Sequence, residues 1–361
     1  MLFTPGQIGT LELPNRLIRS ATAEKMADEE GFPLPTLHEL YTELTRGGVG
    51  LIISGHLYIA PNGKCHPEMT AIDRDQMVPA LAELVQRVHD QGGKVAAQIN
   101  HGGGNCAQEV VSQTIAPSPV NNGLFKQPPQ EIGEKEIESL IQAFGAAAAR
   151  AQKAGFDTVQ IHAAHGYLIS QFLAPLSNRR EDKWGGNLKN SSRFLYRVCQ
   201  AVRESVGSEY PVLIKFGMED GDPQGLSREE GGEVISRLAS WGIDGLEISV
   251  GFSGDHLRSI AKGIRRPADE AYLLPLVKHA RESTDLPLIA VGGYRSRKVM
   301  EQVLLGGWAD FISLSRPLIS EPDLPRRFRE DLQEKSRCIS ANNCWPEEKG
   351  EGIACKCPLD D

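Results

Sequence analysis

Eight short apolar runs rich in β-branched residues alternate along this chain with longer segments of helical periodicity. Each run has the length of a strand, and apolar residues recur every three or four positions in the segments between them. Strands that alternate with helices in this way are typical of a parallel sheet. The runs occupy residues 15–22, 48–55, 94–101, 157–164, 210–217, 245–251, 286–293 and 310–316.

The number of these units predicts the architecture. A doubly wound sheet can hold several of them, but eight in succession favour closure into a (β/α)8 TIM barrel, an α/β fold. The composition changes near residue 333. We therefore expect a barrel over residues 1–332, followed by a short cysteine-containing C-terminal extension over 333–361.

Composition and charge exclude several classes of protein. Hydrophobic residues make up 40% of the 361 residues and charged residues 24%, which is ordinary for a globular chain with a large core. The net charge of −8 argues against a nucleic-acid or anionic-membrane partner. We see no signal peptide, and no apolar stretch reaches the roughly 18 residues of a spanning helix. The sequence therefore predicts a cytoplasmic protein.

Polar and glycine residues end nearly every run. Active sites of TIM barrels lie at the C-terminal ends of the strands, and buried polar groups there are costly unless they have partners. A whole ring of them predicts a ligand site rather than a few satisfied core groups. The ring consists of Ser20, Thr22, Gly55, Gln98, His101, His162, Lys215, Ser249, Gly251, Gly292, Gly293, Ser315 and Arg316.

The densest chemistry lies in residues 161–186, where His162, His165 and Tyr167 stand close together. Two imidazoles can donate hydrogen bonds to one oxygen, and a phenol can protonate a carbon that acquires negative charge. The two histidines could instead bind a metal, although no third ligand is evident nearby.

The same segment, HAAHGYLISQFLAPLSNRREDKWGG, closely resembles the signature of the Old Yellow Enzyme family of flavin-dependent ene-reductases. Further segments resemble the family in the same order over nearly the whole barrel: LFTPGQIGTLELPNRLIRSAT, GLIISG, AAQINHGG, IAPSPV and ADFISLSRPLISEPDLP. EPDLP and the cysteine-bearing tail are most similar to the branch that contains 2,4-dienoyl-CoA reductase and NADH:flavin oxidoreductases. The resemblance implies FMN as cofactor, NAD(P)H as reductant, and small α,β-unsaturated carbonyls or related alkenes as substrates.

The resemblance also implies which residues bind the flavin ring. Gln98 would bond the pyrimidine edge, and Lys215 would stabilise negative charge near N1 and O2 of the reduced flavin. The residues that would line the ring with backbone groups or by close approach are Ser20, Ala21, Thr22 and Gly55.

The phosphate would be held by residues that follow the last two strands. This agrees with the general rule that TIM barrels bind phosphate after strands seven and eight. Glycines expose backbone N–H groups, and an arginine adds a charge-assisted fork. The residues concerned are Gly292, Gly293, Ser315 and Arg316.

For catalysis, the resemblance implies that His162 and His165 hold the oxygen of the activated alkene. A hydride would pass from flavin N5 to the β-carbon, and Tyr167 would give a proton to the α-carbon. NAD(P)H would dock over FMN and leave before the alkene enters, a ping-pong cycle, because the chain stops at Asp361 without a second flavoprotein domain. His101 either faces the same cavity or is a buried, satisfied histidine.

Some positions depart from the family pattern. Ala23 stands where relatives often have Cys or Thr, and Lys25 where some have Tyr, which puts redox tuning and substrate contacts in question. The loop after the third run reads HGGG, with Gly104 where Arg is usual.

The tail departs further, because seven cysteines are present and four of them follow residue 337. An iron–sulfur site of this branch needs a thiolate at the position that Ala341 occupies. Either Cys357 completes a cluster, or the thiolates bind zinc, or the tail holds no metal, which is our prediction. The cysteines concerned are Cys338, Cys344, Cys355 and Cys357.

Two other functions stay open. A flavin-free aldolase or isomerase barrel would also bind a phosphate, with Lys215 as its one candidate Schiff-base lysine and Glu247 as its one strand-end carboxylate. A non-catalytic flavin-binding protein is the second. The partners that we expect are NAD(P)H and a small activated alkene, with no nucleic acid and no membrane, and the sequence leaves a homo-oligomer open.

Overall fold

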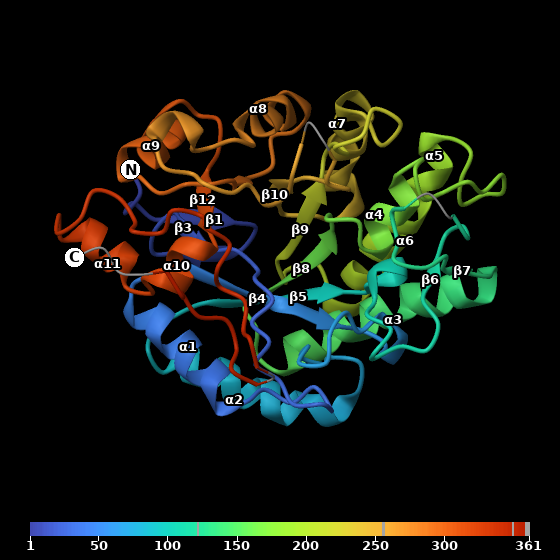
Figure 1. Cartoon of the computed structure of the whole chain (residues 1–361), viewed down its shortest axis with the longest axis horizontal. Coiled ribbons are helices and arrows are strands. Elements are labelled where there is room, and N and C mark those ends of the chain that lie inside the picture. Colours follow the sequence, from blue (N-terminus) through green and yellow to red (C-terminus); the bar gives the residue numbers. More distant parts are fainter. Residues whose placement is uncertain (121–122, 255–256, 349, 358–361) are drawn as a thin grey trace.

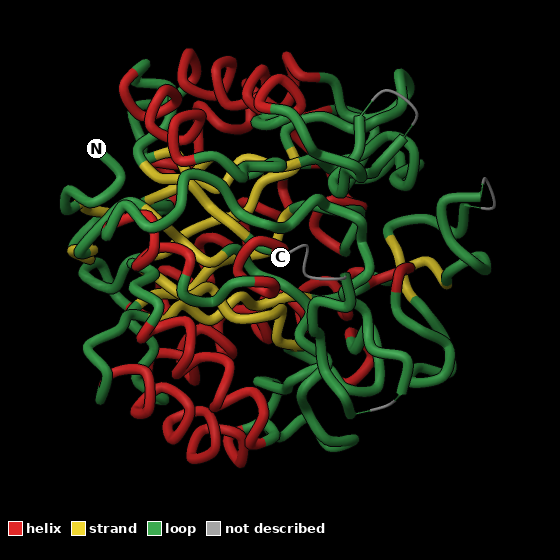
Figure 2. Tube along the Cα trace, turned by 60° about the vertical axis from the view of Figure 1, so that its left-hand side comes forward, coloured by secondary structure: helices red, strands yellow, loops and turns green. Residues whose placement is uncertain are grey.

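The computed structural model describes residues 1–120, 123–254, 257–348 and 350–357. At its centre is a closed barrel of parallel strands with helices around it (Figures 1 and 2). The strand order around the barrel is β10-β11-β12-β3-β4-β5-β8-β9. The strands are β3 (Leu17–Arg19), β4 (Leu51–Tyr58), β5 (Val95–Asn100), β8 (Thr158–Ala163), β9 (Val212–Gly217), β10 (Gly245–Ser249), β11 (Leu288–Ala290) and β12 (Phe311–Leu314).

This arrangement confirms the predicted (β/α)8 TIM barrel, because each of the eight predicted runs overlaps one barrel strand. The run at 48–55 differs most from its strand, since β4 begins at Leu51 and continues to Tyr58. The difference matters for the site, because it carries additional side chains to the open end of the barrel.

The helices lie outside the strands, and several begin with local signals that the sequence carries. Before α7 the Ser227 side chain accepts from the Glu230 N–H while the Glu230 carboxylate accepts from the Ser227 N–H, a capping box. The helices are α1 (Pro35–Arg46), α2 (Val78–His89), α3 (Glu134–Lys153), α4 (Leu168–Leu173), α5 (Leu188–Ser191), α6 (Arg193–Val206), α7 (Arg228–Leu238), α8 (Leu274–Ser283), α9 (Arg297–Leu305), α10 (Arg316–Ser320) and α11 (Leu324–Arg329).

One end of the barrel is closed by an N-terminal hairpin, β1 (Gly6–Ile8) with β2 (Leu11–Leu13). Apolar side chains of the hairpin join those of the barrel interior, such as Leu51 and Phe311, in one buried cluster. Ile8 contacts the first residue of β10, so the hairpin lies at the amino ends of the strands. The carboxyl ends are therefore the end at which a ligand can enter.

A β-bulge interrupts the pairing of β4 with β5. Ile53 pairs with Ala96, but the next pairing is His56 with Gln98, so β4 has one residue more than β5 between these pairs. Side chains alternate between the two faces of a strand, and the extra residue reverses that alternation. His56 therefore turns towards the side that Ile53 faces.

The segment after α11 packs on loops at the open end of the barrel and appears in red in Figure 1. Ile353 N–H donates to the Glu24 carbonyl at 3.0 Å, and Gly263 N–H donates to the Ser340 carbonyl at 3.1 Å. A short strand pair, β6 (Ile115–Ala116) with β7 (Gln130–Glu131), belongs to the long segment between β5 and α3. Among the described residues, no helix has the length and apolar character needed to cross a bilayer.

Candidate active site

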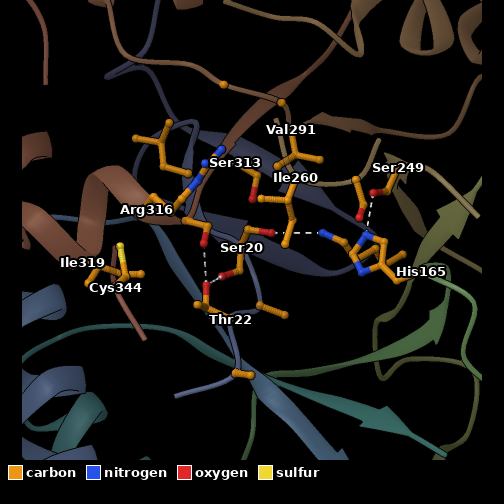
Figure 3. Close-up of a pocket in the computed structure, with 18 of the residues that line it drawn as sticks. Ser20, Thr22, His165, Ser249, Ile260, Val291, Ser313, Arg316, Ile319 and Cys344 are labelled. Atoms are coloured by element: carbon orange, nitrogen blue, oxygen red, sulfur yellow. Dashed lines mark hydrogen bonds between the residues drawn. The ribbon is translucent and has the colours of Figure 1, made fainter. Parts of the chain in front are cut away.

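A cavity of about 250 Å³ opens at the carboxyl ends of the barrel strands. In Figure 3, His165 and Ser249 lie at one end of this cavity and Arg316 at the other, with Ser20 and Thr22 between them. All the predicted cofactor and catalytic residues except Gly55 line it. They are Ser20, Ala21, Thr22, Gln98, His162, His165, Tyr167, Lys215, Gly292, Gly293, Ser315 and Arg316.

A network of buried polar side chains supports the middle of the cavity. Lys215 Nζ lies 2.9 Å from Glu247 Oε1 and donates to Ser20 Oγ at 3.0 Å. Ser20 Oγ in turn donates to Glu247 Oε1 at 2.6 Å. The second oxygen of Glu247 accepts from Gln160 Nε2 at 3.1 Å, and Gln160 Oε1 accepts from Gln98 Nε2 at 2.7 Å. This network leaves the side-chain oxygen of Gln98 for a ligand.

Glu247 and Lys215 form a buried ion pair at the base of the cavity. Burial raises the pKa of Glu247, but the nearby Lys215 charge and the hydrogen bonds from Ser20, Lys215 and Gln160 outweigh it, so the pKa is lowered. An ammonium in a buried ion pair is a fixed positive charge and a poor nucleophile. Lys215 is therefore suited to stabilise an anionic ligand rather than to form a Schiff base.

Two histidines and a tyrosine gather at one end of the cavity. The ring centroids of His162 lie 5.0 Å from His165 and 4.9 Å from Tyr167, both edge to face. His165 Nε2 is 2.8 Å from Ser249 Oγ, and within the described part of the chain no group bonds the Tyr167 hydroxyl. His162 Nδ1 is buried without a partner. The Tyr167 hydroxyl and the imidazole edges that line the cavity can contact a ligand oxygen, whereas His162 Nδ1 itself is enclosed by protein.

His165 and Tyr167 lie in a strained turn that follows β8. His165 adopts a left-handed backbone with φ of 60°, which is uncommon outside glycine, and its N–H donates to the Val250 carbonyl at 3.0 Å. Such conformations persist where surrounding contacts hold them, and they cluster at functional sites. The turn lies between the end of β8 at Ala163 and the start of α4 at Leu168.

Burial keeps these groups uncharged. It lowers the pKa of His165 to about 3, with further contributions from Lys215 and His56, and it holds the pKa of His162 well below the usual value. It also raises the pKa of Tyr167. At neutral pH each imidazole therefore offers one N–H donor, and the phenol keeps its proton.

The opposite end of the cavity offers unpaired donors that fit a phosphate. Among the described residues, the N–H groups of Gly292, Gly293 and Arg316 have no hydrogen-bond partner. The Arg316 guanidinium donates through Nη1 to the Ala261 carbonyl at 2.7 Å and to Asn342 Oδ1, which leaves its other donors for a ligand. Fixed N–H groups beside a guanidinium favour an anion.

The cavity as a whole fits FMN. Its donors suit a phosphate at one end, and the amide of Gln98 and the ammonium of Lys215 suit a polar ring edge near the middle. Ser313 Oγ, which also lines the cavity, is buried without a protein partner. Buried polar atoms without partners are costly, so a polar ligand at this position would stabilise the site.

Gly55 does not line the cavity. Its N–H donates to Glu24 Oε1 at 2.8 Å, and a Cβ at this position would stand 1.8 Å from Glu24 Oε2. The structure places the Glu24 carboxylate beside Gly55, and the close approach of Gly55 to the flavin ring stays a prediction. His101 also stays outside the cavity, since it is fully buried with Nε2 3.1 Å from Asn62 Oδ1, so the structural alternative holds.

Sequence reasoning missed His56 and the part of the tail that lines the cavity. His56 lies beyond the predicted end of its strand, and only the bulge in β4 turns it inward. Asn342, Cys344 and Trp345 form part of the wall. Lys25 Nζ lies 5.7 Å from the centroid of the Trp345 ring, a cation–π contact that no local pattern indicates.

The tail cysteines surround a second, smaller cavity of about 20 Å³. Cys338, Cys344, Cys355 and Cys357 all line it, and so does Ala341. Among the described residues, no group of three or more His, Cys, Asp or Glu side chains is placed to hold a metal ion. As placed, these residues do not fit a four-thiolate cluster, and the expectation for the tail stays a prediction.

Comparisons with known proteins agree with this geometry. The family described as NADH:flavin oxidoreductase / NADH oxidase matches residues 1–335. A relative named NADH oxidase, from Thermoanaerobacter brockii, is 34% identical over 345 residues, which cover 94% of this chain and 52% of the relative. A relative named NADPH dehydrogenase, from Geobacillus thermodenitrificans, is 33% identical over 333 residues, which cover 92% of this chain and 94% of the relative.

A solved structure is similar as well. The structure of the Old Yellow Enzyme homologue from Zymomonas mobilis aligns with a TM-score of 0.80 and 29% identity, over 94% of this chain and 95% of that one. Some relatives are much longer: the chain spans about half the length of the relatives named NADH oxidase and metal reductase, at 52% and 51%.

Proposed function

This chain belongs to the NADH:flavin oxidoreductase / NADH oxidase family, and on that premise we propose that it uses NAD(P)H to reduce activated C=C bonds. The resemblance to the Old Yellow Enzyme family is confirmed, and FMN is the cofactor of that family. One observation carries the proposal: the unbonded Tyr167 hydroxyl lies beside two neutral imidazoles in a cavity whose other end offers phosphate donors.

Bound FMN would supply hydride transfer, by accepting a hydride from NAD(P)H and passing it to the alkene. Gly292, Gly293, Ser315 and Arg316 would hold its phosphate, and Gln98 its pyrimidine edge. Lys215, fixed by Glu247, would place a positive charge where negative charge develops, which is the largest contribution that fixed groups make in many enzymes.

His162 and His165 would bind the substrate oxygen. Both are neutral, so each donates one hydrogen bond and withdraws electron density from the conjugated alkene. The Ser249 hydroxyl beside His165 Nε2 fixes that ring. Tyr167 would then donate its proton to the α-carbon, and among the described residues no other unbonded hydroxyl lies near the two imidazoles.

The flavin-free alternative is not favoured, since Lys215 is held in an ion pair with Glu247. A non-catalytic flavin protein would not need the Tyr167 hydroxyl free in the cavity. We also propose that the protein is cytoplasmic, that NAD(P)H and alkene occupy the cavity in turn, and that the physiological partner is a small activated alkene.

The experiment that tests this function uses the Tyr167→Phe variant, loaded with FMN. Loss of the proton donor should lower kcat/KM for an enone by roughly 10²–10⁴, the usual contribution of a positioned general acid. NAD(P)H oxidation with a quinone should change by less than about threefold, because quinone oxygens take protons from solvent. Steady-state rates with both acceptors, followed through NAD(P)H absorbance, give the comparison.

The matched control is Tyr196→Phe, an exposed tyrosine on α6 that should leave both rates unchanged. An enone rate that is the same in Tyr167→Phe and the unaltered protein would remove Tyr167 from the mechanism. An unaltered protein that binds FMN and oxidises NAD(P)H but reduces no enone would refute the proposed reaction itself.

A further inference from the structure

His56 lines the cavity and has no part in the function described so far. Its ring lies 5.2 Å from the Tyr167 ring and 6.3 Å from the His162 ring, measured between centroids. It therefore stands next to the two side chains that would handle the substrate oxygen and the proton, and it reaches them from β4, on the other side of β5 from β8.

Asn100, at the end of β5, contacts one ring nitrogen of His56. Asn100 Nδ2 lies 2.9 Å from His56 Nδ1. With the Asn100 amide nitrogen facing Nδ1, Nδ1 accepts and the imidazole proton belongs on Nε2. Among the described residues no group bonds that Nε2, and it is not fully enclosed by protein. The side chain thus presents one N–H donor to the cavity.

The donor stays neutral in the working range. Burial lowers the pKa of His56 to about 3, and the neighbouring His66 contributes to the shift. A neutral N–H can bind a carbonyl oxygen but cannot act as a cationic acid at neutral pH. His56 is therefore equipped to recognise an acceptor rather than to supply the proton.

We propose that His56 is a specificity-determining residue, whose Nε2–H binds a second acceptor oxygen on the substrate. The inference rests on the proposed function. With His162 and His165 on one carbonyl, a donor on β4, across β5 from β8, favours alkenes flanked by two conjugated acceptors, such as ene-1,4-diones, over simple enones. A bound alkene with one carbonyl covers this N–H without accepting from it, and a donor that loses water without gaining a partner weakens binding.

The test uses two ring alkenes that differ by one carbonyl: 2,6,6-trimethylcyclohex-2-ene-1,4-dione and 2,6,6-trimethylcyclohex-2-enone. Each is reduced with one NAD(P)H and one proton. In His56→Leu, kcat/KM for the dione should fall roughly 10- to 100-fold, and that for the mono-enone less than about threefold. His56→Gln keeps an N–H donor at a similar distance from the backbone. It should retain at least half of the preference for the dione over the mono-enone, measured as the ratio of their kcat/KM values.

A binding measurement separates recognition from chemistry. The saturated 1,4-dione and the saturated monoketone have no C=C bond left for this reaction, and each is titrated against FMN-loaded protein by the change in flavin absorbance. His56→Leu should raise the Kd of the dione roughly 10- to 100-fold and leave that of the monoketone unchanged. His66→Leu is the matched control, since this neighbour packs 5.8 Å from the His56 ring without lining the cavity.

The outcomes are distinct. Equal losses for both ring alkenes in His56→Leu, or no loss for either, would overturn the role of His56. If His56→Leu retains no flavin, His56→Gln decides the question: a normal preference supports the role, and a lost preference overturns it. An unaltered protein that reduces neither alkene would refute the proposed function, whereas retained binding selectivity in the titrations would still support the second acceptor site.

Discussion

At the residue scale, contacts with other side chains hold several polar groups of the cavity in place. Lys215 forms an ion pair with Glu247 and a hydrogen bond to Ser20, and Gln98 donates a hydrogen bond to Gln160. Removing Lys215 would leave the Glu247 carboxylate buried and unpaired, which typically costs about 3–5 kcal/mol. Loss of flavin in such a variant could not be assigned to a lost contact, so Arg316 is the better residue for testing the phosphate site.

Replacing the guanidinium should weaken FMN binding directly. Arg316→Ala removes the free donors at the phosphate end, and charge-assisted hydrogen bonds contribute about 1.5–3 kcal/mol. We expect the Kd of FMN to rise roughly 10- to 100-fold, measured by quenching of flavin fluorescence on titration with flavin-free protein.

Arg337→Ala provides the comparison for that measurement. This guanidinium lines only the smaller, cysteine-lined cavity, with Nε 3.3 Å from Glu321 Oε1, so its loss should leave the Kd of FMN within about twofold. An unchanged Kd in Arg316→Ala would place the phosphate elsewhere.

At the scale of elements, the bulge in β4 connects the end of β4 to the segment that follows β3. The bulge turns His56 inward, and it presents the Gly55 N–H to Glu24. Glu24 Oε1 also accepts from Arg19 Nη1 at 2.8 Å and from the Tyr41 hydroxyl at 2.9 Å. This buried cluster anchors the segment after β3, which includes the cavity residues Ser20 to Ala23.

A methyl group on Gly55 should disturb both stability and cofactor retention. In Gly55→Ala the new Cβ would stand 1.8 Å from Glu24 Oε2 and 2.7 Å from the Thr22 carbonyl. Overpacking typically costs about 1–3 kcal/mol, and disruption of the buried Arg19–Glu24 pair adds to that cost. We expect a loss of at least about 2 kcal/mol in urea unfolding, together with lower FMN content after purification.

Gly133→Ala is the control for an added methyl group, because nothing lies within 4 Å of a Cβ there. It should cost less than about 1 kcal/mol. If Gly55→Ala were as stable as the unaltered protein and held as much FMN, the contact with Glu24 would have no structural importance.

At the scale of the whole molecule, the tail connects the two cavities. Cys344 lines both of them, and Asn342 accepts a hydrogen bond from Arg316 at the phosphate end. The tail therefore forms part of the wall of the large cavity whether or not its cysteines bind a metal. Burial raises the pKa of the Cys344 thiol to about 11, so without a metal it stays protonated at neutral pH.

Metal analysis tests the tail. Protein purified without oxygen should contain fewer than four irons per chain, with no iron–sulfur cluster, because Ala341 offers no thiolate where the four cysteines converge. Iron and acid-labile sulfide assays measure this directly.

Ala341→Cys serves as the paired variant, and it should gain iron and sulfide after reconstitution. About four irons and four sulfides in the unaltered chain would contradict the prediction and show that Cys357 completes the ligand set.

The barrel and most of the cavity were readable from the sequence, because both depend on local order. Strand and helix periodicity is set by neighbouring residues, and eight parallel strands bring their carboxyl ends together, so His162, Lys215 and Arg316 had to converge. The contacts across the barrel were not readable in this way. The alternation of β4 depends on one extra residue opposite β5, which turned His56 into the cavity and Gly55 towards Glu24. The pairing of Lys215 with Glu247 and the docking of Asn342 on Arg316 likewise depend on distances between separate segments, which only the folded chain defines.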